Sequence, residues 1–248
     1  MQAPREVISV DVPVDFETAW AHVRDPGLIR RWWGWDHEGL DHDIERTFLR
    51  EATVQRPDPQ LPVAWLHWHN NDRLEVRGGL SRRHSTVLVR RPDHLLLASY
   101  DGVRDEVDEQ WITWLHQLRF ALTEHFGQER RSFAVHGLAG ERQDRILYQA
   151  GLYGARGTPV GGAVEIRRPD GSIAGGRLEY STPHQFGVRL RGHGDSLLVV
   201  QLLPPASRPP RGSVNVFWSV WGLEGSDLAA AEDRWASWWR TPQLSARG

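Results

Sequence analysis

The residues best suited to metal chemistry are His67 and His69, which stand two positions apart and so share one face of a strand. Such a pair can bind zinc or iron, but a metal site needs three or four ligands in a fixed geometry. Asp72 follows in the next turn, and His37, His42 and Asp43 could in principle complete a set. Because no third ligand is marked by its spacing, we interpret the pair as surface histidines and expect no metal.

A group of acidic residues near the middle of the chain could serve acid–base catalysis or bind a metal. These residues are Asp101, Asp105, Glu106, Asp108 and Glu109. Negative charge is also favoured in the first turn of a helix, because the helix dipole attracts it there. We therefore interpret the group as helix capping and solvated charge.

Arg30-Arg31, beside Trp32, is a third candidate, since arginine can hold an acidic ligand head or a partner's carboxylate by bidentate contacts. The alternative is a solvated helix end, where exposed charges contribute little. The chain has no cysteine, no nucleophile elbow and no glycine-rich loop with the spacing of a nucleotide site. We therefore assign no catalytic residue, expect no cofactor, and prefer a role without catalysis while leaving enzyme activity open.

Tryptophan is the most distinctive feature of the composition. The chain has 13 tryptophans and 1 methionine, which favours stiff aromatic walls over adaptable ones. One stretch places its large apolar residues at helical spacing on a single face, and so predicts an amphipathic helix. These residues are Trp111, Trp114, Leu115, Leu118 and Leu122. Such tryptophans either belong to the core or line an apolar pocket.

A weaker copy of this stretch occurs half a chain length later. Residues 108–115 and 232–239 both read acid, acid, polar, Trp, aliphatic, hydroxyl, Trp, bulky apolar. Ser226 or Asp227 can cap the helix of the second copy. A repeat of this length indicates two domains, each closed by a Trp-bearing helix.

Short runs of alternating apolar and polar residues, bounded by turn residues, predict strands in the rest of the first half. These predicted strands are 6–12, 44–54, 63–69, 73–78, 86–90 and 95–100. Asn70-Asn71-Asp72 predicts the turn of a hairpin. Asp15 is expected to cap a helix over 16–23, and Asp25-Pro26-Gly27 to end it before a short helix over 28–33.

The second half also reads mostly as strands. They are predicted at 132–138, 162–168, 177–181, 187–191, 196–203 and 213–221. A short helix is predicted at 144–152, and Arg168-Pro169-Asp170-Gly171 is a strong turn sequence. The opening helices of the first half have no counterpart here, so we expect a degenerate copy.

The opening of the chain carries a family resemblance. A strand, Pro13-Val14, a helix with Trp20, and then Asp25-Pro26-Gly27-Leu28 leading to Trp32-Trp33 resembles the opening of the START-like (SRPBCC) helix-grip superfamily. Within it, the segment is most similar to the branch of the activator of the heat-shock-protein-90 ATPase, whose members close with a long, Trp-bearing helix. The resemblance covers residues 6–125 well and is faint over 126–248.

This resemblance, and the runs of strands closed by one helix, predict an α+β protein of two tandem helix-grip domains. Each would be an antiparallel sheet curled round a C-terminal helix, with a START-like domain at 1–125 and a degenerate second domain at 131–248. The superfamily binds apolar ligands between helix and sheet. The lining residues expected here are Trp33, Leu66, Trp68, Trp111, Trp114 and Leu118. Trp68 is preferred to Trp65 because Trp65 shares its face with both histidines.

Three functions fit these expectations. The first is carriage or sensing of a small hydrophobic or aromatic ligand. The second, as in some relatives, is a polyketide cyclase or aromatase, which would need a titratable residue in the pocket. The third is interaction with a chaperone, by family analogy alone.

The composition limits partners and compartment. A net charge of −2 disfavours nucleic-acid and anionic-membrane partners, which need a basic surface. The N-terminus shows no signal peptide, and no apolar run is long enough to span a membrane. We therefore expect a cytoplasmic protein.

Overall fold

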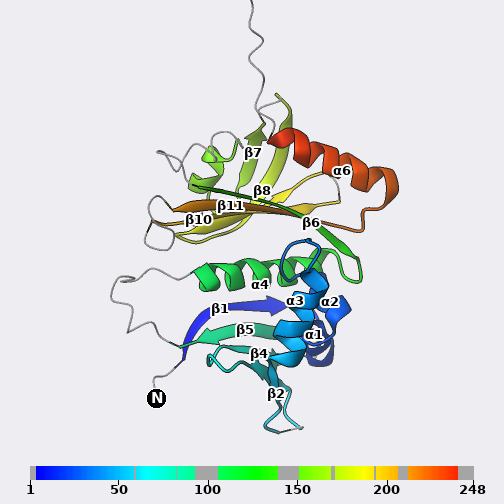
Figure 1. Ribbon diagram of the computed structural model, residues 1–248, viewed down its shortest axis with the longest axis vertical. Helices are drawn as coiled ribbons and strands as arrows, with labels where there is room; N and C mark the ends of the chain where they lie inside the picture. The colour runs from blue at the N-terminus through cyan, green and yellow to red at the C-terminus, as the bar shows by residue number, and fades with distance from the viewer. Residues whose placement is uncertain are drawn as a thin grey trace, which may run out of the picture. The chain divides into compact units, whose positions relative to one another are not determined.

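The structure is a computed structural model, which describes residues 4–58, 60–81, 83–92, 106–138, 151–168, 171–192, 194–205 and 212–239. The chain divides into two compact units, Met1–Arg130 and Arg131–Gly248. In the described residues, each unit contains one antiparallel sheet, followed by a long helix near the C-terminal end of the unit (Figure 1).

The described part of the first unit contains a sheet of five antiparallel strands. In spatial order they are β1 (Arg5–Val12), β5 (Ser85–Arg91), β4 (Arg73–Gly78), β3 (Val63–His67) and β2 (Thr53–Gln55). The predicted hairpin is confirmed, because β3 and β4 pair across a turn in which Asn71 adopts a left-handed φ of 65°. Leu66 and Trp68 are buried, whereas Trp65 and His67 are partly exposed, so the predicted inward face is confirmed.

Two short helices follow β1. Asp15 caps α1 (Phe16–His22) as predicted, since its carboxylate accepts a 2.8 Å hydrogen bond from the Thr18 backbone N–H. That bond also lowers the pKa of Asp15, because it stabilises the ionised carboxylate.

The second helix, α2 (Pro26–Arg30), begins earlier than predicted. Asp25 is its cap, and proline suits the first helical position because its missing N–H would have no partner there. Asp25-Pro26-Gly27 therefore starts this helix rather than ending α1, which already ends at His22.

The prediction of a long strand over residues 44–54 was wrong. The segment forms the end of α3 (Leu40–Ile44) and a turn of π-helix, η1 (Glu45–Arg50), and only Thr53–Gln55 is a strand. Through α3 and η1 the buried apolar residues recur at every fourth position, which is a helical spacing rather than the alternation of a strand. They are Leu40, Ile44 and Phe48.

The long helix α4 (Glu106–Glu124) packs against β1 and β5 (Figure 1). The predicted stripe is confirmed, with Trp111, Leu115 and Leu118 all buried. Burial extends beyond that stripe, because Thr113, Gln117 and Phe120 are buried as well. The helix is therefore less one-sided than its sequence predicted. The predicted strand at 95–100 lies outside the described residues.

His22, at the end of α1, makes the first unit sensitive to acid. Its imidazole is buried, and its Nδ1 lies 2.8 Å from the Thr18 carbonyl oxygen. Burial lowers the pKa of His22, the Thr18 contact opposes this, Arg31 lowers the pKa further and Asp25 raises it. Because the folded pKa lies below the unfolded one, the unfolded chain binds the proton more readily.

The melting temperature should therefore fall as the pH is lowered from about 7.5 to about 5.5, through the range where the unfolded histidine titrates. The stabilisation is present above the unfolded pKa and is lost as the pH falls toward the lowered folded pKa. In His22→Asn, which keeps a donor near the position of Nδ1, the fall in melting temperature over this pH range should be smaller. Identical pH profiles for the variant and the wild type, measured by thermal melts, would contradict this role for His22.

Among its described residues, the second unit contains a six-stranded antiparallel sheet. Its order is β6 (Arg130–Leu138), β11 (Ser213–Trp221), β10 (Ser196–Leu203), β9 (Gln185–Leu190), β8 (Ile173–Ser181) and β7 (Ala163–Arg167). All six predicted strands are confirmed. β8 begins four positions earlier than predicted, because Gly175 and Gly176 pair with β7. A 3₁₀ turn, η3 (Tyr153–Gly157), precedes β7, and residues 144–150 of the predicted helix lie outside the described part of the chain.

The closing helix α6 (Gly225–Trp238) packs its tryptophans on the core of this sheet. Ala231 and Trp238 are buried in the core, and Trp235 and Trp239 pack against it. The Trp-bearing closing helix predicted from the repeat is therefore confirmed. The predicted cap was wrong: the helix begins after Glu224, without a side-chain cap, and Ser226 and Asp227 lie inside it.

The two units share one strand order. In each, the first strand lies beside the last described strand, and the remaining strands follow in reverse chain order. Each sheet carries a C-terminal helix on its apolar side, α4 or α6. The predicted α+β class with tandem helix-grip domains is thereby confirmed. Among the helices of the described residues, none is long and apolar enough to cross a membrane.

Candidate functional site

The aromatic rings of the first unit form one continuous cluster. Ring centroids are 5.0 Å apart for Trp33 and Trp114, 5.2 Å for Trp111 and Trp114, and 5.8 Å for Trp68 and Trp111. Phe48 lies 5.3 Å from Trp33 and 6.0 Å from Trp68. All these pairs are tilted or edge-on, which is a favoured geometry for aromatic rings. The cluster is therefore well packed.

The structure thus brings together the four tryptophans predicted to line a pocket, and it fully buries the other two predicted residues, Leu66 and Leu118. Phe48 belongs to the cluster but was missed, because its segment was assigned to a strand. Trp33 and Trp114 are 8% and 9% exposed, against 2–5% for Phe48, Trp68 and Trp111, so the small exposed part of this buried cluster lies mostly at the Trp33–Trp114 pair. A role in ligand binding for these residues stays a prediction.

The backbone beside Trp33 is fixed by two buried polar side chains that the sequence did not mark. Gln117 Nε2 donates a 3.1 Å hydrogen bond to the Trp32 carbonyl oxygen. Arg130 donates to the carbonyl oxygens of Trp33, at 2.7 Å, and Gly34, at 2.8 Å, and to Gln117 Oε1 at 3.1 Å. Burial lowers the pKa of Arg130 to about 10, so the guanidinium stays charged near neutral pH. These bonds hold Trp33 against α4.

Trp33 differs from its neighbours in the state of its indole N–H. Trp32 Nε1 donates to the His22 carbonyl oxygen at 2.8 Å, and Trp68 Nε1 donates to the Thr47 carbonyl oxygen at 2.7 Å. Trp33 Nε1 is buried and meets no hydrogen-bond partner within the described residues. A buried donor without an acceptor costs about 1–3 kcal/mol. An acceptor brought to this position would recover part of that cost.

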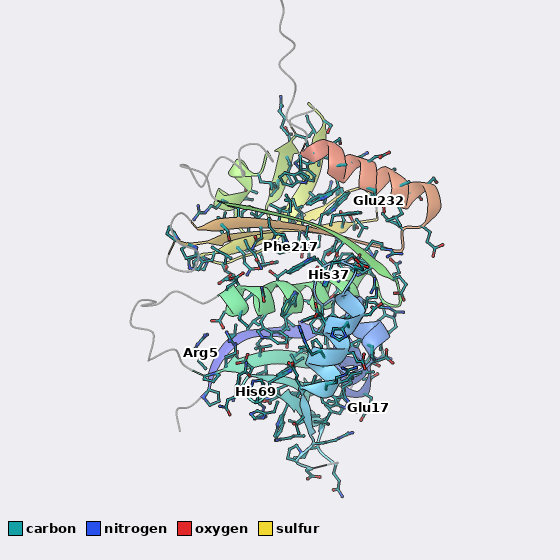
Figure 2. The ribbon with its side chains drawn as sticks, viewed as in Figure 1. Arg5, Glu17, His37, His69, Phe217 and Glu232 are labelled. Atoms are coloured by element: carbon teal, nitrogen blue, oxygen red, sulfur yellow. The ribbon has the colours of Figure 1, made fainter. Side chains whose placement is uncertain are left out.

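The interpretation of Asp108 and Glu109 as solvated charge was wrong, since these residues are 0% and 1% exposed. Asp108 accepts hydrogen bonds from Arg91 Nη1 at 2.8 Å and from Arg5 Nη2 at 2.5 Å. Arg91 Nε lies 3.0 Å from both carboxylate oxygens of Asp72. Figure 2 places Arg5 at the start of β1. The charges form a buried network because β1, β5 and α4 meet there, which no local pattern could predict.

This network lies one helical turn before Trp111 on α4. Its carboxylates face arginine side chains of their own chain, so the network is suited to positioning charge close to the aromatic cluster. Asp101 and Asp105, from the same predicted group, lie outside the described residues.

The histidine pair stays at the surface, with His67 partly exposed and His69 exposed (Figure 2). Across the described ranges, no three His, Asp or Glu side chains gather as a metal site would require. The interpretation as surface histidines agrees with this exposure, and the expectation of no bound metal stays a prediction.

Arg30 and Arg31 bind carboxylates of their own chain. Arg30 Nη2 lies 3.2 Å from Asp36, and Arg30 Nη1 contacts Asp41. Arg31 Nη2 lies 2.5 Å from Glu129. Both arginines are therefore paired within the first unit rather than freely solvated, and a role for them in ligand binding stays a prediction.

Among the comparisons with known proteins, only the search of solved structures found similar chains. No family model and no curated protein matches the chain. The di-domain ARO/CYC BexL from the BE-7585A biosynthetic pathway is 14% identical, with a TM-score of 0.34 over 96% of this chain and 93% of that one. The di-domain ARO/CYC StfQ from the steffimycin pathway is 12% identical, with a TM-score of 0.33 over 93% and 92%.

A third solved structure, DynU16 from the dynemicin biosynthetic locus, is 13% identical, with a TM-score of 0.27 over 94% of this chain and 93% of that one. None of these similarities singles out the branch of the heat-shock-protein-90 ATPase activator, so that finer resemblance is not confirmed. At these identities and scores, the similarities carry no argument about activity.

Proposed function

We propose that the first unit binds a flat aromatic molecule that bears hydrogen-bond acceptors, such as carbonyl or phenol oxygens, at the Trp33–Trp114 edge of the aromatic cluster. The single observation that carries this proposal is the buried Trp33 N–H without a partner among the described residues. An apolar ring would stack on the tryptophans, and its oxygen would accept the indole hydrogen bond.

The energetics favour a ligand with both properties. Contact between aromatic rings contributes about 0.5–1.5 kcal/mol beyond the area that is buried. Satisfying a buried donor removes a cost of about 1–3 kcal/mol, which a hydrocarbon ring could not do. Gln117 and Arg130 hold the Trp33 backbone in place, so little ordering is needed on binding. A protein that binds such a molecule without converting it would serve as its carrier or its sensor.

Anthraquinone and anthracene test this preference, because they have nearly the same shape and only the first has carbonyl acceptors. The wild type should bind anthraquinone about tenfold more tightly, as followed by quenching of tryptophan fluorescence, since one hydrogen bond of about 1.4 kcal/mol corresponds to that ratio. Trp33→Phe, which removes the N–H and keeps an aromatic ring, should abolish the difference. Equal affinity of the wild type for the two probes would refute the proposal.

Trp68→Phe is the matched control. Its indole N–H is already bonded to Thr47, so its loss should leave the anthraquinone preference intact while lowering stability more than Trp33→Phe does. If both variants lose the preference together, the effect belongs to general repacking of the cluster and not to the Trp33 N–H.

An enzyme of the polyketide aromatase or cyclase kind is the second candidate. The observation in its favour is the buried Asp108–Arg91–Asp72 network, one helical turn from Trp111, which could polarise a bound carbonyl group. Incubation with a poly-β-ketone and detection of an aromatic product by absorbance separates catalysis from carriage. Product formation that persists in Trp33→Phe would favour turnover at another position.

A further inference from the structure

A hollow lined by charged residues opens on the sheet of the second unit. It encloses about 230 Å³ and is lined by Arg177, Arg189, Arg191 and Asp195. One ordered water needs only roughly 10–15 Å³ of such space, so a larger polar group fits. The Arg177 side chain is 51% exposed, so the hollow is open to solvent.

Two of the arginines are neighbours on adjacent strands of the sheet. Arg177 in β8 and Arg189 in β9 are direct partners in the antiparallel register, an arrangement in which like charges repel. Arg177 Nη2 lies 2.9 Å from Glu179, and Arg189 Nη2 lies 2.9 Å from Asp195. Each arginine thus has an acidic neighbour, which relieves part of the repulsion between them.

Arg191 adds a further positive charge. Its backbone N–H donates a 2.9 Å hydrogen bond to the Gly175 carbonyl oxygen, which fixes its position against β8. Its exposed side chain has no ion-pair or hydrogen-bond partner within the described residues. Gly175 has no side chain, and a Cβ there would meet nothing within 4 Å, so the space over Gly175, beside Arg191, is open.

The lining therefore has three arginines against one aspartate, in a chain whose net charge is −2. Guanidinium groups match the oxygens of phosphate in pairs, and several arginines around one hollow suit an anion with several oxygens. We propose that this hollow is a binding site for a phosphate dianion, either free or as a phosphate monoester.

Titration of the full chain with inorganic phosphate at low ionic strength, by calorimetry or ³¹P NMR, tests the site. The wild type should show saturable binding, and Arg191→Gln should weaken it by about tenfold or more, since it removes a charge-assisted contact. Arg177→Gln should have a similar effect. Asp195→Asn should strengthen binding, because it removes the negative charge that the described lining contains.

Arg167→Gln is the matched control. Arg167 also lies on a strand of this sheet and has an acidic neighbour two positions away, with 3.6 Å to Glu165, but it does not line the hollow. Its loss should leave phosphate affinity unchanged. Absence of saturable binding by the wild type, or equal weakening in Arg167→Gln and Arg191→Gln, would overturn the proposal. An unchanged melting temperature in each variant excludes unfolding as the cause.

The source of the phosphate is identified by two further probes. Glycerol 3-phosphate presents a soluble monoester, and phosphatidylcholine vesicles that contain phosphatidic acid present the same group on a lipid surface. Binding of either probe that depends on Arg191 supports the site, and the tighter probe identifies the source. If both probes bind Arg191→Gln as well as they bind the wild type, the site is refuted.

Discussion

Replacement of Arg91 by methionine is expected to lower the free energy of unfolding by about 3–5 kcal/mol, because it leaves buried carboxylates without their principal counter-charge. The Arg91 guanidinium lies between Asp72 and Asp108, whose side chains are 7% and 0% exposed. In Arg91→Met, Asp108 keeps Arg5 among its ion-pair partners, and Arg5 is 26% exposed at the edge of the network. The methionine fills much of the volume but supplies no positive charge.

Denaturant unfolding measures this effect as a lowered midpoint at an unchanged slope. In the Arg91→Met background, a further change of Asp108 to asparagine should cost less than it does in the wild type, because the carboxylate it removes has already lost its Arg91 partner. Glu45→Gln is the control: it removes one partner of an exposed pair, 2.8 Å from Arg50, and should cost at most about 1 kcal/mol. A cost for Arg91→Met as small as the control's would mean that the network adds nothing to stability.

Replacement of Trp114 by alanine is expected to cost about 3–5 kcal/mol of stability, because it leaves a cavity in the aromatic cluster. Trp114 contacts Trp33 and Trp111 at 5.0 and 5.2 Å between ring centroids, and it is only 9% exposed. Both neighbouring rings would lose contacts that cannot be rebuilt without moving α4. Melting temperature and denaturant midpoint should both fall.

The same substitution at Trp65 is the matched control. Trp65 lies on the opposite face of β3, is partly exposed, stacks under Arg73 and donates its N–H to Gln55 at 2.8 Å. Trp65→Ala should therefore cost clearly less than Trp114→Ala. A near-unchanged melting temperature in Trp114→Ala, with loss of anthraquinone binding, would instead make Trp114 the wall of an open pocket and would contradict its assignment to the packed core.

The sequence by itself determined the features that depend on local spacing. Helical spacing around Trp111 and the later copy at 232–239 predicted the two closing helices, and the alternation of β3 predicted that Trp68 points inward. Asp15 was predictable as a cap because the side chain and the N–H it satisfies are three residues apart. The prediction for the segment around Phe48 was wrong, although its buried apolar residues recur every fourth position. A short apolar run fits the period of a helix as well as that of a strand.

Only the tertiary structure decided the chemistry of the charged and polar groups. Asp108 reads as a helix-start carboxylate, yet it is buried because Arg5 and Arg91 reach it from distant strands. Arg130 acquires its role only where it meets the Trp33 carbonyl, far away in sequence. The physical reason is that apolar periodicity is set by neighbours along one element. The charge state and partners of a buried polar group are instead set by whichever elements the fold packs around it.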